Sequence, residues 1–223
     1  MTRLLHTDPL LFEAGDHMPR EEFLDRWERM PELKNAELID GVVYMPSPVS
    51  LAHGDSDGFL LGVLIFYAWR TPGCRFTPNT TWLMLESAPQ PDGVLRILPE
   101  YGGRTGVRDK LASGSPELVA EVVVSSRSYD LGPKLALYQR AGVPEYIAAL
   151  NEEQRIEWRI FERGSYRMMQ PDPDGVSRSR IFPGLWLDSV AYWAENTTRL
   201  LSVLEEGLAS EEHQRFVEQL RPR

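Results

Sequence analysis

The spacing of apolar and polar residues predicts helices in four parts of the chain. In the first, Phe23 and Trp27 lie four positions apart on one face, and the other segments repeat apolar side chains at the same helical interval. In the third, Asp130 is the expected N-cap and Gly142 follows the last turn. The predicted helices cover residues 19–30, 53–70, 130–141 and 189–207.

Runs of alternating or continuous apolar residues predict strands, which gather in the middle of the chain. The dipeptides Asp40-Gly41 and Arg163-Gly164 are turn signals that predict two hairpins. Residues 101–115 carry four glycines, and we expect them to form a long loop. The predicted strands cover residues 37–45 (as a hairpin), 73–77, 80–86, 93–98, 118–124, 146–150, 155–162 and 165–170.

This order of elements predicts the fold class. Helices occur early, centrally and late around a central group of strands, which indicates an α/β or α+β fold with a mostly antiparallel sheet flanked by helices. The chain has 223 residues, of which 42% are hydrophobic, enough for one sizeable core. We expect a single domain over residues 1–223, with its core in about 19–193 and a charged C-terminal helix and frayed tail in about 194–223.

The composition indicates the cellular compartment in which the protein acts. Cys74 is the one cysteine, so no internal disulfide can form and a reducing compartment is expected. The N-terminus lacks the continuous apolar run of a signal peptide. The longest apolar stretch, residues 59–69, falls short of the roughly 20 residues that a membrane span needs. The sequence therefore predicts a cytoplasmic protein with no membrane partner.

The net charge of −9 argues against non-specific binding to nucleic acid, which normally requires a basic surface. Any nucleic-acid function must use a local basic patch, a bound cation, or both.

Glu121 is the most unusual residue of the pattern. It interrupts Leu118–Val124, a run that is otherwise apolar on both faces and reads as a buried central strand. A buried lone carboxylate is costly unless it is paired, protonated or bound to a metal. A structural salt bridge and a functional site are therefore both open for Glu121.

Five other polar residues are candidates that each have an ordinary alternative. Asp92 follows Pro91 at a strand start, where a turn aspartate is the simpler interpretation. Lys134 and Tyr138 lie four apart on one helix face. Glu37 begins the first hairpin, and His53 begins a helix. Taken singly, each is more often a surface or structural residue than a catalytic one.

Several other site classes lack their patterns. No Cys/His spacing suggests zinc. Gly102-Gly103 and Gly106 lack the strand and the Lys-Ser/Thr of a phosphate loop. Ser125-Ser126 lacks the G-x-S-x-G of a serine hydrolase.

The candidates together resemble the PD-(D/E)-x-K nuclease superfamily, in which an acid at a strand start precedes an acid in a buried strand. Val123 stands where that motif has its lysine, and Lys134 on the next helix is the nearest substitute. This displaced lysine is similar to the arrangement in the Uma-two family of restriction endonucleases. The matching pieces are Ala36 to Gly41, Val42 to Pro48, His53, Gln90-Pro91-Asp92, Leu118 to Ser125, Asp130 with Lys134 and Tyr138, Ala141 to Tyr146, and Pro183 to Leu185.

The resemblance implies a restriction-endonuclease-like sheet and a set of roles. Asp92 and Glu121 would be ligands of Mg²⁺, with Mn²⁺ as the alternative ion, and Glu37 would be a further catalytic acid. Lys134 would orient the attacking water or stabilise phosphate charge. The supporting residues would be His53 and Tyr138. The chain departs from the family where Ile147 follows Tyr146 and where Ser126 follows Ser125, which concerns the surroundings of the site.

The function that follows is an endonuclease that hydrolyses DNA phosphodiester bonds with a metal-activated water, leaving a 3′-hydroxyl and a 5′-phosphate. Two alternatives stay open: a catalytically silent binding module with the nuclease fold, and another metal-dependent phosphodiesterase. A homodimer is a further prediction, because two sites cut two strands. The candidate phosphate contacts are Arg104, Arg108, Lys110 and Arg127.

Overall fold

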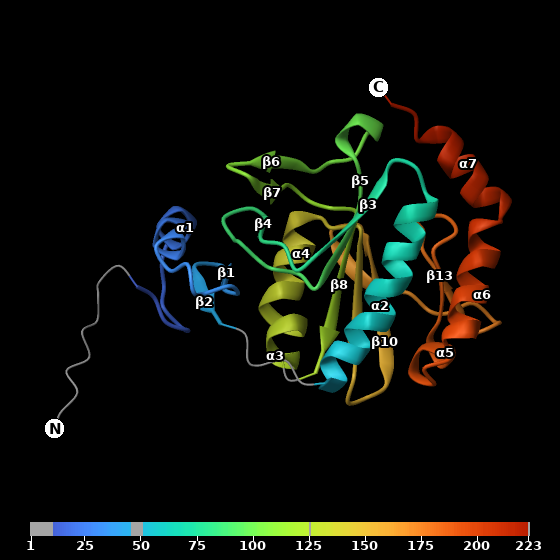
Figure 1. The fold of residues 1–223 in the computed structure, drawn as a ribbon, viewed down its shortest axis with the longest axis horizontal. Helices are drawn as coiled ribbons and strands as arrows, with labels where there is room; N and C mark the ends of the chain where they lie inside the picture. The colour runs from blue at the N-terminus through green and yellow to red at the C-terminus, as the bar shows by residue number, and fades with distance from the viewer. Residues whose placement is uncertain (1–10, 46–50, 125, 223) are drawn as a thin grey trace.

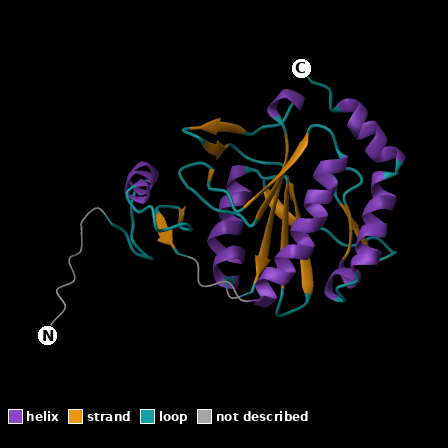
Figure 2. Ribbon diagram, viewed as in Figure 1, coloured by secondary structure: helices purple, strands orange, loops and turns teal. Residues whose placement is uncertain are grey.

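The structure is a computed structural model that describes residues 11–45, 51–124 and 126–222, with the side chains of residues 51–57 outside the description. Its largest element is a six-stranded sheet in the order β11-β10-β9-β8-β5-β3. Strands β8 and β9 run parallel, and the other four neighbouring pairs are antiparallel. The predicted mostly antiparallel sheet flanked by helices is therefore confirmed, as Figures 1 and 2 show.

The elements follow one another from the N-terminal hairpin to a C-terminal pair of helices. The helices are α1 (Arg20–Glu28), α2 (Leu51–Arg70), a 3₁₀ turn (Pro99–Tyr101), α3 (Arg127–Tyr129), a π-helical turn (Asp130–Lys134), α4 (Leu135–Ala141), α5 (Ser189–Trp193), α6 (Thr197–Leu208) and α7 (Glu211–Gln219). The strands are β1 (Glu37–Ile39), β2 (Val42–Tyr44), β3 (Cys74–Pro78), β4 (Trp82–Leu83), β5 (Gly93–Ile97), β6 (Gly106–Arg108), β7 (Leu111–Ser113), β8 (Leu118–Val123), β9 (Glu145–Leu150), β10 (Arg155–Glu162), β11 (Ser165–Met168), β12 (Val176–Arg178) and β13 (Trp186–Asp188).

Two apolar layers hold the sheet between its helices (Figure 1). On one face, α2 and the C-terminal helices α5 and α6 pack around Leu64, Tyr67 and Leu204. On the other face, α4 packs through Leu137 and Tyr138. A third, smaller cluster joins α1 to the β1–β2 hairpin.

Strand β8 lies in the middle of this arrangement, and every one of its residues is buried. Leu118, Ala120 and Val122 belong to the layer under α2, whereas Val119 and Val123 belong to the layer under α4. Because side chains alternate along a strand, Glu121 projects into the second layer. The prediction of a buried central strand is confirmed.

Both predicted hairpin turns are confirmed. Asp40 and Gly41 have φ values of 51° and 80°, and Arg163 and Gly164 have φ values of 52° and 86°. Two successive residues with positive φ are typical of the type I′ turns that match the twist of antiparallel strands. The first turn pairs Ile39 with Val42 and so fixes where Glu37 lies.

The predicted loop over residues 101–115 is wrong in part. Its second half folds into the β6–β7 hairpin, which turns at Asp109 and Lys110 with φ values of 51° and 68°. Both strands have only three residues; β6 is exposed, with Val107 76% exposed, and β7 is partly buried, so they carry no clear alternating apolar pattern. The predicted strand over residues 80–86 shrinks to β4, because the chain turns back at Leu85 with φ 50°.

The C-terminal region differs most from its prediction. The single helix over residues 189–207 is two helices, because Asn196 accepts a hydrogen bond from the backbone N–H of Arg199 and starts α6. The prediction of a frayed tail is wrong, because Ser210 caps the helix α7 and His213 in that helix is buried. Leu200 and Leu220 join the main apolar layer, so the core extends beyond residue 193. Strands β12 and β13 were not predicted.

No helix in the described part of the chain combines the length and the apolar character that crossing a membrane requires.

Candidate active site

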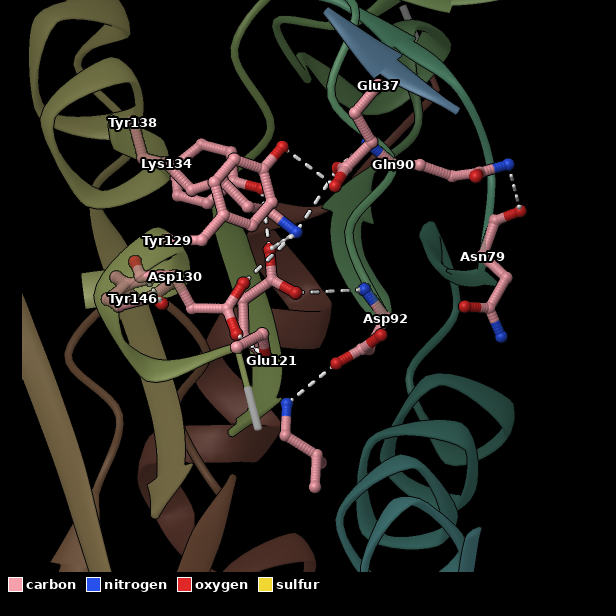
Figure 3. Close-up of polar contacts among 12 residues, drawn as sticks. Glu37, Asn79, Gln90, Asp92, Glu121, Tyr129, Asp130, Lys134, Tyr138 and Tyr146 are labelled. Atoms are coloured by element: carbon pink, nitrogen blue, oxygen red, sulfur yellow. Dashed lines mark hydrogen bonds and ion pairs between the residues drawn. The ribbon is translucent and has the colours of Figure 1, made fainter. Parts of the chain in front are cut away.

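Glu121 is the centre of a buried polar cluster between β8 and α4 (Figure 3). Its side chain is 1% exposed, and its Oε1 lies 2.7 Å from Lys134 Nζ. The Tyr138 hydroxyl donates a hydrogen bond to the same oxygen at 2.6 Å. The backbone N–H of Asp92 donates to Glu121 Oε2 at 3.3 Å. The carboxylate is therefore paired, as a buried charge requires.

Lys134 reaches Glu121 because the helix that carries it is bent. The chain turns in a wide π-helical segment from Asp130 to Lys134, and Gly132 inside it has the non-helical angles φ −111° and ψ −105°. Pro133 has no N–H to donate, which favours the irregular turn. Nζ of Lys134 also lies 3.6 Å from Asp130 Oδ1.

The prediction that Asp130 is an N-cap is wrong. The helical segment already begins at Arg127, and Asp130 itself has helical angles. Its carboxylate accepts a hydrogen bond from the Ser126 hydroxyl and pairs with Lys134. Asp130 is thus a fourth acid beside the predicted ones, and its i to i+4 spacing from Lys134 is the signal in the sequence that points to it.

Glu37 enters the cluster from the N-terminal hairpin. Its Oε1 lies 3.2 Å from Lys134 Nζ, and its Oε2 accepts a hydrogen bond from the Tyr129 hydroxyl at 2.8 Å. The backbone N–H of Gln90 donates to Glu37 as well. Tyr129 also stacks on Tyr44 of the same hairpin, with ring centroids 4.1 Å apart. No pattern in the sequence points to Tyr129, which links the hairpin to the site.

Asp92 lies at the start of β5, beside Glu121 on the neighbouring strand. Its Oδ2 accepts a hydrogen bond from the backbone N–H of Val122 at 2.7 Å. Its own N–H donates to Glu121, so Asp92 contacts two successive residues of β8. The side chain is half-buried, which leaves it closer to solvent than Glu121.

The charges of the cluster do not balance. Four carboxylates, those of Glu37, Asp92, Glu121 and Asp130, surround the single ammonium of Lys134. Burial raises the pKa of Glu121 well above its usual value; Lys134 opposes this, and the other acids add to it. Burial lowers the pKa of Lys134, but the carboxylates around it outweigh burial and raise that pKa. An excess of buried negative charge is the setting in which a cation is attracted.

The donor chemistry fits a hard divalent ion in one place. Asp92 and Glu121 are acids beside each other at the β5–β8 pair, close enough for the Asp92 charge to act on Glu121. Mg²⁺ is commonly bound by one or two carboxylates, with waters and phosphate completing its shell. Across the described residues, no three His, Cys, Asp or Glu side chains converge as a ready-made metal site. The ammonium of Lys134 lies within 3.2 Å of Glu37 and 2.7 Å of Glu121.

The four basic candidates are not part of this cluster. Arg104 lies at the far end of β8, where it pairs with Glu117 at 3.7 Å. Arg108 and Lys110 lie on the exposed β6–β7 hairpin. Arg127 follows β8 at the cluster's end of the strand but pairs with Glu153. His53 is in α2, and its side chain lies outside the described residues.

Comparisons with known proteins agree with the motifs. The family model Uma2, described as "Putative restriction endonuclease", matches residues 20–190. A crystal structure described as a putative nuclease belonging to DUF820, from Anabaena variabilis ATCC 29413, superimposes with a TM-score of 0.59 at 14% identity. The match covers 84% of this chain and 99% of that chain, and at this identity it shows the fold alone. Among curated proteins, none matches the chain.

Proposed function

Because the chain belongs to the Uma2 family, we propose that it is a divalent-metal-dependent nuclease that hydrolyses DNA phosphodiester bonds at the cluster around Glu121. One observation carries the proposal: a buried lysine is held at 2.7 Å and 3.2 Å by carboxylates from two separate parts of the chain, with Asp92 beside them. A purely structural ion pair needs one acid, whereas this lysine has three.

In this proposal Asp92 and Glu121 hold the metal ion. When bound, the ion supplies a Lewis acid that polarises a phosphoryl oxygen and lowers the pKa of a bound water. Asp92 is the less buried of the two, so its carboxylate is the more accessible to solvent and to an arriving phosphate.

Lys134 serves as a fixed positive charge in the proposed site. The carboxylates around it raise its pKa, so it is a cation at neutral pH and does not act as a general base. A preorganised cation of this kind stabilises the negative charge that develops on the phosphate. Glu37, Asp130 and Tyr138 position it, directly or through Glu121.

The test is titration of Mg²⁺ and Mn²⁺ by calorimetry on the wild type and on the near-isosteric variants D92N and E121Q. Nuclease assays on plasmid and single-stranded DNA follow with the same samples. The control is E162Q, which removes an acid paired with Arg180 at the surface. We expect the wild type and the control to bind metal and cleave DNA, and both site variants to lose both properties. A wild type that binds no metal at millimolar concentration, with or without DNA, would exclude the proposal.

A silent binding module is the second candidate, and two observations favour it. The net charge of −9 opposes DNA binding, and the described residues hold no ready-made group of three metal ligands. This candidate requires binding of a protein partner or of DNA that is unchanged by EDTA and by E121Q, without product formation. Metal-dependent cleavage by the wild type alone excludes it.

A further inference from the structure

Two arginines, Arg75 and Arg96 (the arginine pair), lie directly opposite each other at one edge of the six-stranded sheet. Arg75 is on the edge strand β3 and Arg96 on its neighbour β5, and the two strands lie side by side in Figure 1. Like charges in directly opposite positions destabilise a sheet. The fold therefore keeps a cross-strand pair that lowers its own stability.

The nearby acids do not neutralise the arginine pair. Burial lowers the pKa of Arg96 and the charge of Arg75 lowers it further, an effect larger than the opposing effect of Glu117 or of Glu100. Glu117 is also engaged elsewhere, since its carboxylate lies 3.7 Å from Arg104 Nε and accepts a hydrogen bond from the Arg104 backbone N–H. Arg75 is exposed and forms no ion pair within the part of the chain that the structure describes.

Arg96 is held in place with most of its donors unused. Its guanidinium carbon lies 5.9 Å from the centre of the Trp82 ring, and its Nη1 donates to the Thr105 hydroxyl at 3.4 Å. The side chain makes no other hydrogen bond among the described residues. Since a guanidinium carries five N–H donors in a planar fork, the arginine pair presents a concentration of positive charge and of directed donors that the fold itself does not use.

The arginine pair lies on the same face of the sheet as the acidic cluster. Phe76 and Leu95 pack in the layer under α2, whereas Val94 packs in the layer under α4. Side chains alternate along a strand, so Arg75 and Arg96 project to the α4 side, away from α2. Glu121 projects to that same side from β8, two strands away from β3.

Strand β3 leads from the arginine pair to the proposed site. At its other end Pro78 pairs with Gly93, and Asn79 donates its backbone N–H to the Asp92 carbonyl at 3.2 Å, beside which it lies in Figure 3. The strand from Arg75 to Asn79 spans roughly 13 Å. One strand of a duplex carries a phosphate about every 3.4 Å along the axis, so this length corresponds to about four phosphates.

We propose that Arg75 and Arg96 together bind one backbone phosphate of a nucleic acid whose scissile phosphate lies at Asp92. The inference rests on the proposed function for what happens at Asp92. A phosphate between the two guanidinium groups replaces their repulsion with two attractions, and the planar fork of arginine matches phosphate oxygens. Such a contact fixes the position of the backbone and carries no base sequence. It also supplies local positive charge to a chain whose net charge is −9.

The test measures binding of fluorescein-labelled duplex and single-stranded oligonucleotides by anisotropy over a range of salt, in EDTA, where no metal supports cleavage. The variants are R75Q, R96Q and R75Q/R96Q. The matched control is R167Q, which removes an exposed arginine on β11, the opposite edge strand, whose cross-strand partner is the apolar Ile160. Thermal melting verifies that each variant is folded, and melting with sodium phosphate at constant ionic strength shows whether inorganic phosphate binds the arginine pair.

We expect R75Q to bind both oligonucleotides roughly 10- to 100-fold more weakly than the wild type and R167Q. The double variant should lower the slope of log affinity against log salt by about 0.9 on the duplex and about 0.7 on the single strand, as loss of one phosphate contact does. Without nucleic acid, R75Q should melt at a higher temperature than the wild type, because the repulsion is gone. Inorganic phosphate should raise the melting temperature of the wild type more than that of R75Q.

Three results would overturn the proposal. The first is binding by R75Q/R96Q that equals binding by R167Q, or no binding by the wild type. The second is stabilisation by inorganic phosphate that depends on Arg75 without any change in nucleic-acid binding, which would assign the arginine pair to a different anion. The third is a lower melting temperature for R75Q with unchanged binding, which would assign the pair to the fold itself.

The two proposals fail in different ways. Cleavage of DNA with no dependence on Arg75 overturns the phosphate contact and leaves the nuclease. Binding that depends on Arg75, without any cleavage in metal, overturns the nuclease and leaves the phosphate contact.

Discussion

Replacing Lys134 with methionine tests whether the acidic cluster depends on one buried cation. The change keeps the length of the side chain and removes the charge that lies 2.7 Å from Glu121, 3.2 Å from Glu37 and 3.6 Å from Asp130. Removal of one partner from a buried ion pair destabilises a protein by about 3–5 kcal/mol. Since these acids are almost fully buried, water replaces little of the loss, and we expect K134M to fall in that range at neutral pH.

The loss should depend on pH in a defined direction. Burial already raises the pKa of Glu121, and removal of the ammonium raises the pKa values of the neighbouring acids further. A glutamate in the unfolded chain has a pKa of about 4.3, so above that pH the folded variant binds more protons than the unfolded chain. The stability of the variant therefore falls as pH rises through the raised pKa values of the folded state. K134M should therefore lose more stability relative to wild type at about pH 8 than at about pH 5.5.

Urea unfolding in EDTA at both pH values measures the difference between K134M and the wild type. The double variant K134M/E121Q provides the internal check, because removal of one acid relieves part of the repulsion and should recover part of the lost stability. A cost below about 1 kcal/mol, or the same cost at both pH values, would refute the reasoning that Lys134 neutralises the buried acids.

Two further changes test the surroundings of the cluster and the C-terminal helix. Y138F removes the 2.6 Å hydrogen bond to Glu121 and should lower the free energy of unfolding in urea by about 1.5–3 kcal/mol. For DNA cleavage, kcat should fall by a larger factor than the factor by which KM changes. Unchanged stability would show that this bond contributes nothing. His213 forms hydrogen bonds with the Thr71 hydroxyl and the Leu208 carbonyl, and burial lowers its pKa. The folded state therefore favours the neutral imidazole, and the stability of the protein should fall as pH drops through about 6.5. H213Q should show a smaller loss than wild type between about pH 7 and pH 5.5, and an identical loss would assign the effect to other groups.

The part of the site that lies within strongly patterned segments could be predicted from the sequence. Glu121 is conspicuous because it interrupts a buried apolar run, and the structure places it in that setting. Asp40-Gly41 predicts the hairpin that carries Glu37, because that turn requires residues that tolerate positive φ. These signals are local, so they can be read from neighbouring residues alone.

The remaining contacts depend on tertiary structure. Tyr129 reaches Glu37, 92 positions away in the sequence, and no local pattern encodes that distance. The bend at Gly132 could be suspected from Gly-Pro, but its direction toward the sheet comes from packing. Strands β6 and β7 have three residues each, too few for an alternating pattern to be recognised. Helix α7 has only two large apolar residues, Phe216 and Val217, so its burial against the core could not be read from the sequence.

The order of the site residues along the chain has a consequence for folding kinetics. Glu121, Asp130, Lys134 and Tyr138 all come from the stretch between the start of β8 and the end of α4, which forms contacts over short sequence separations. Contacts of that kind form early, because closing a short loop loses little entropy. Glu37 comes from a hairpin almost a hundred residues away and closes over Lys134 at 3.2 Å. The lysine would thus meet its nearby acids first, and docking of the N-terminal hairpin would be the later event that seals it from water.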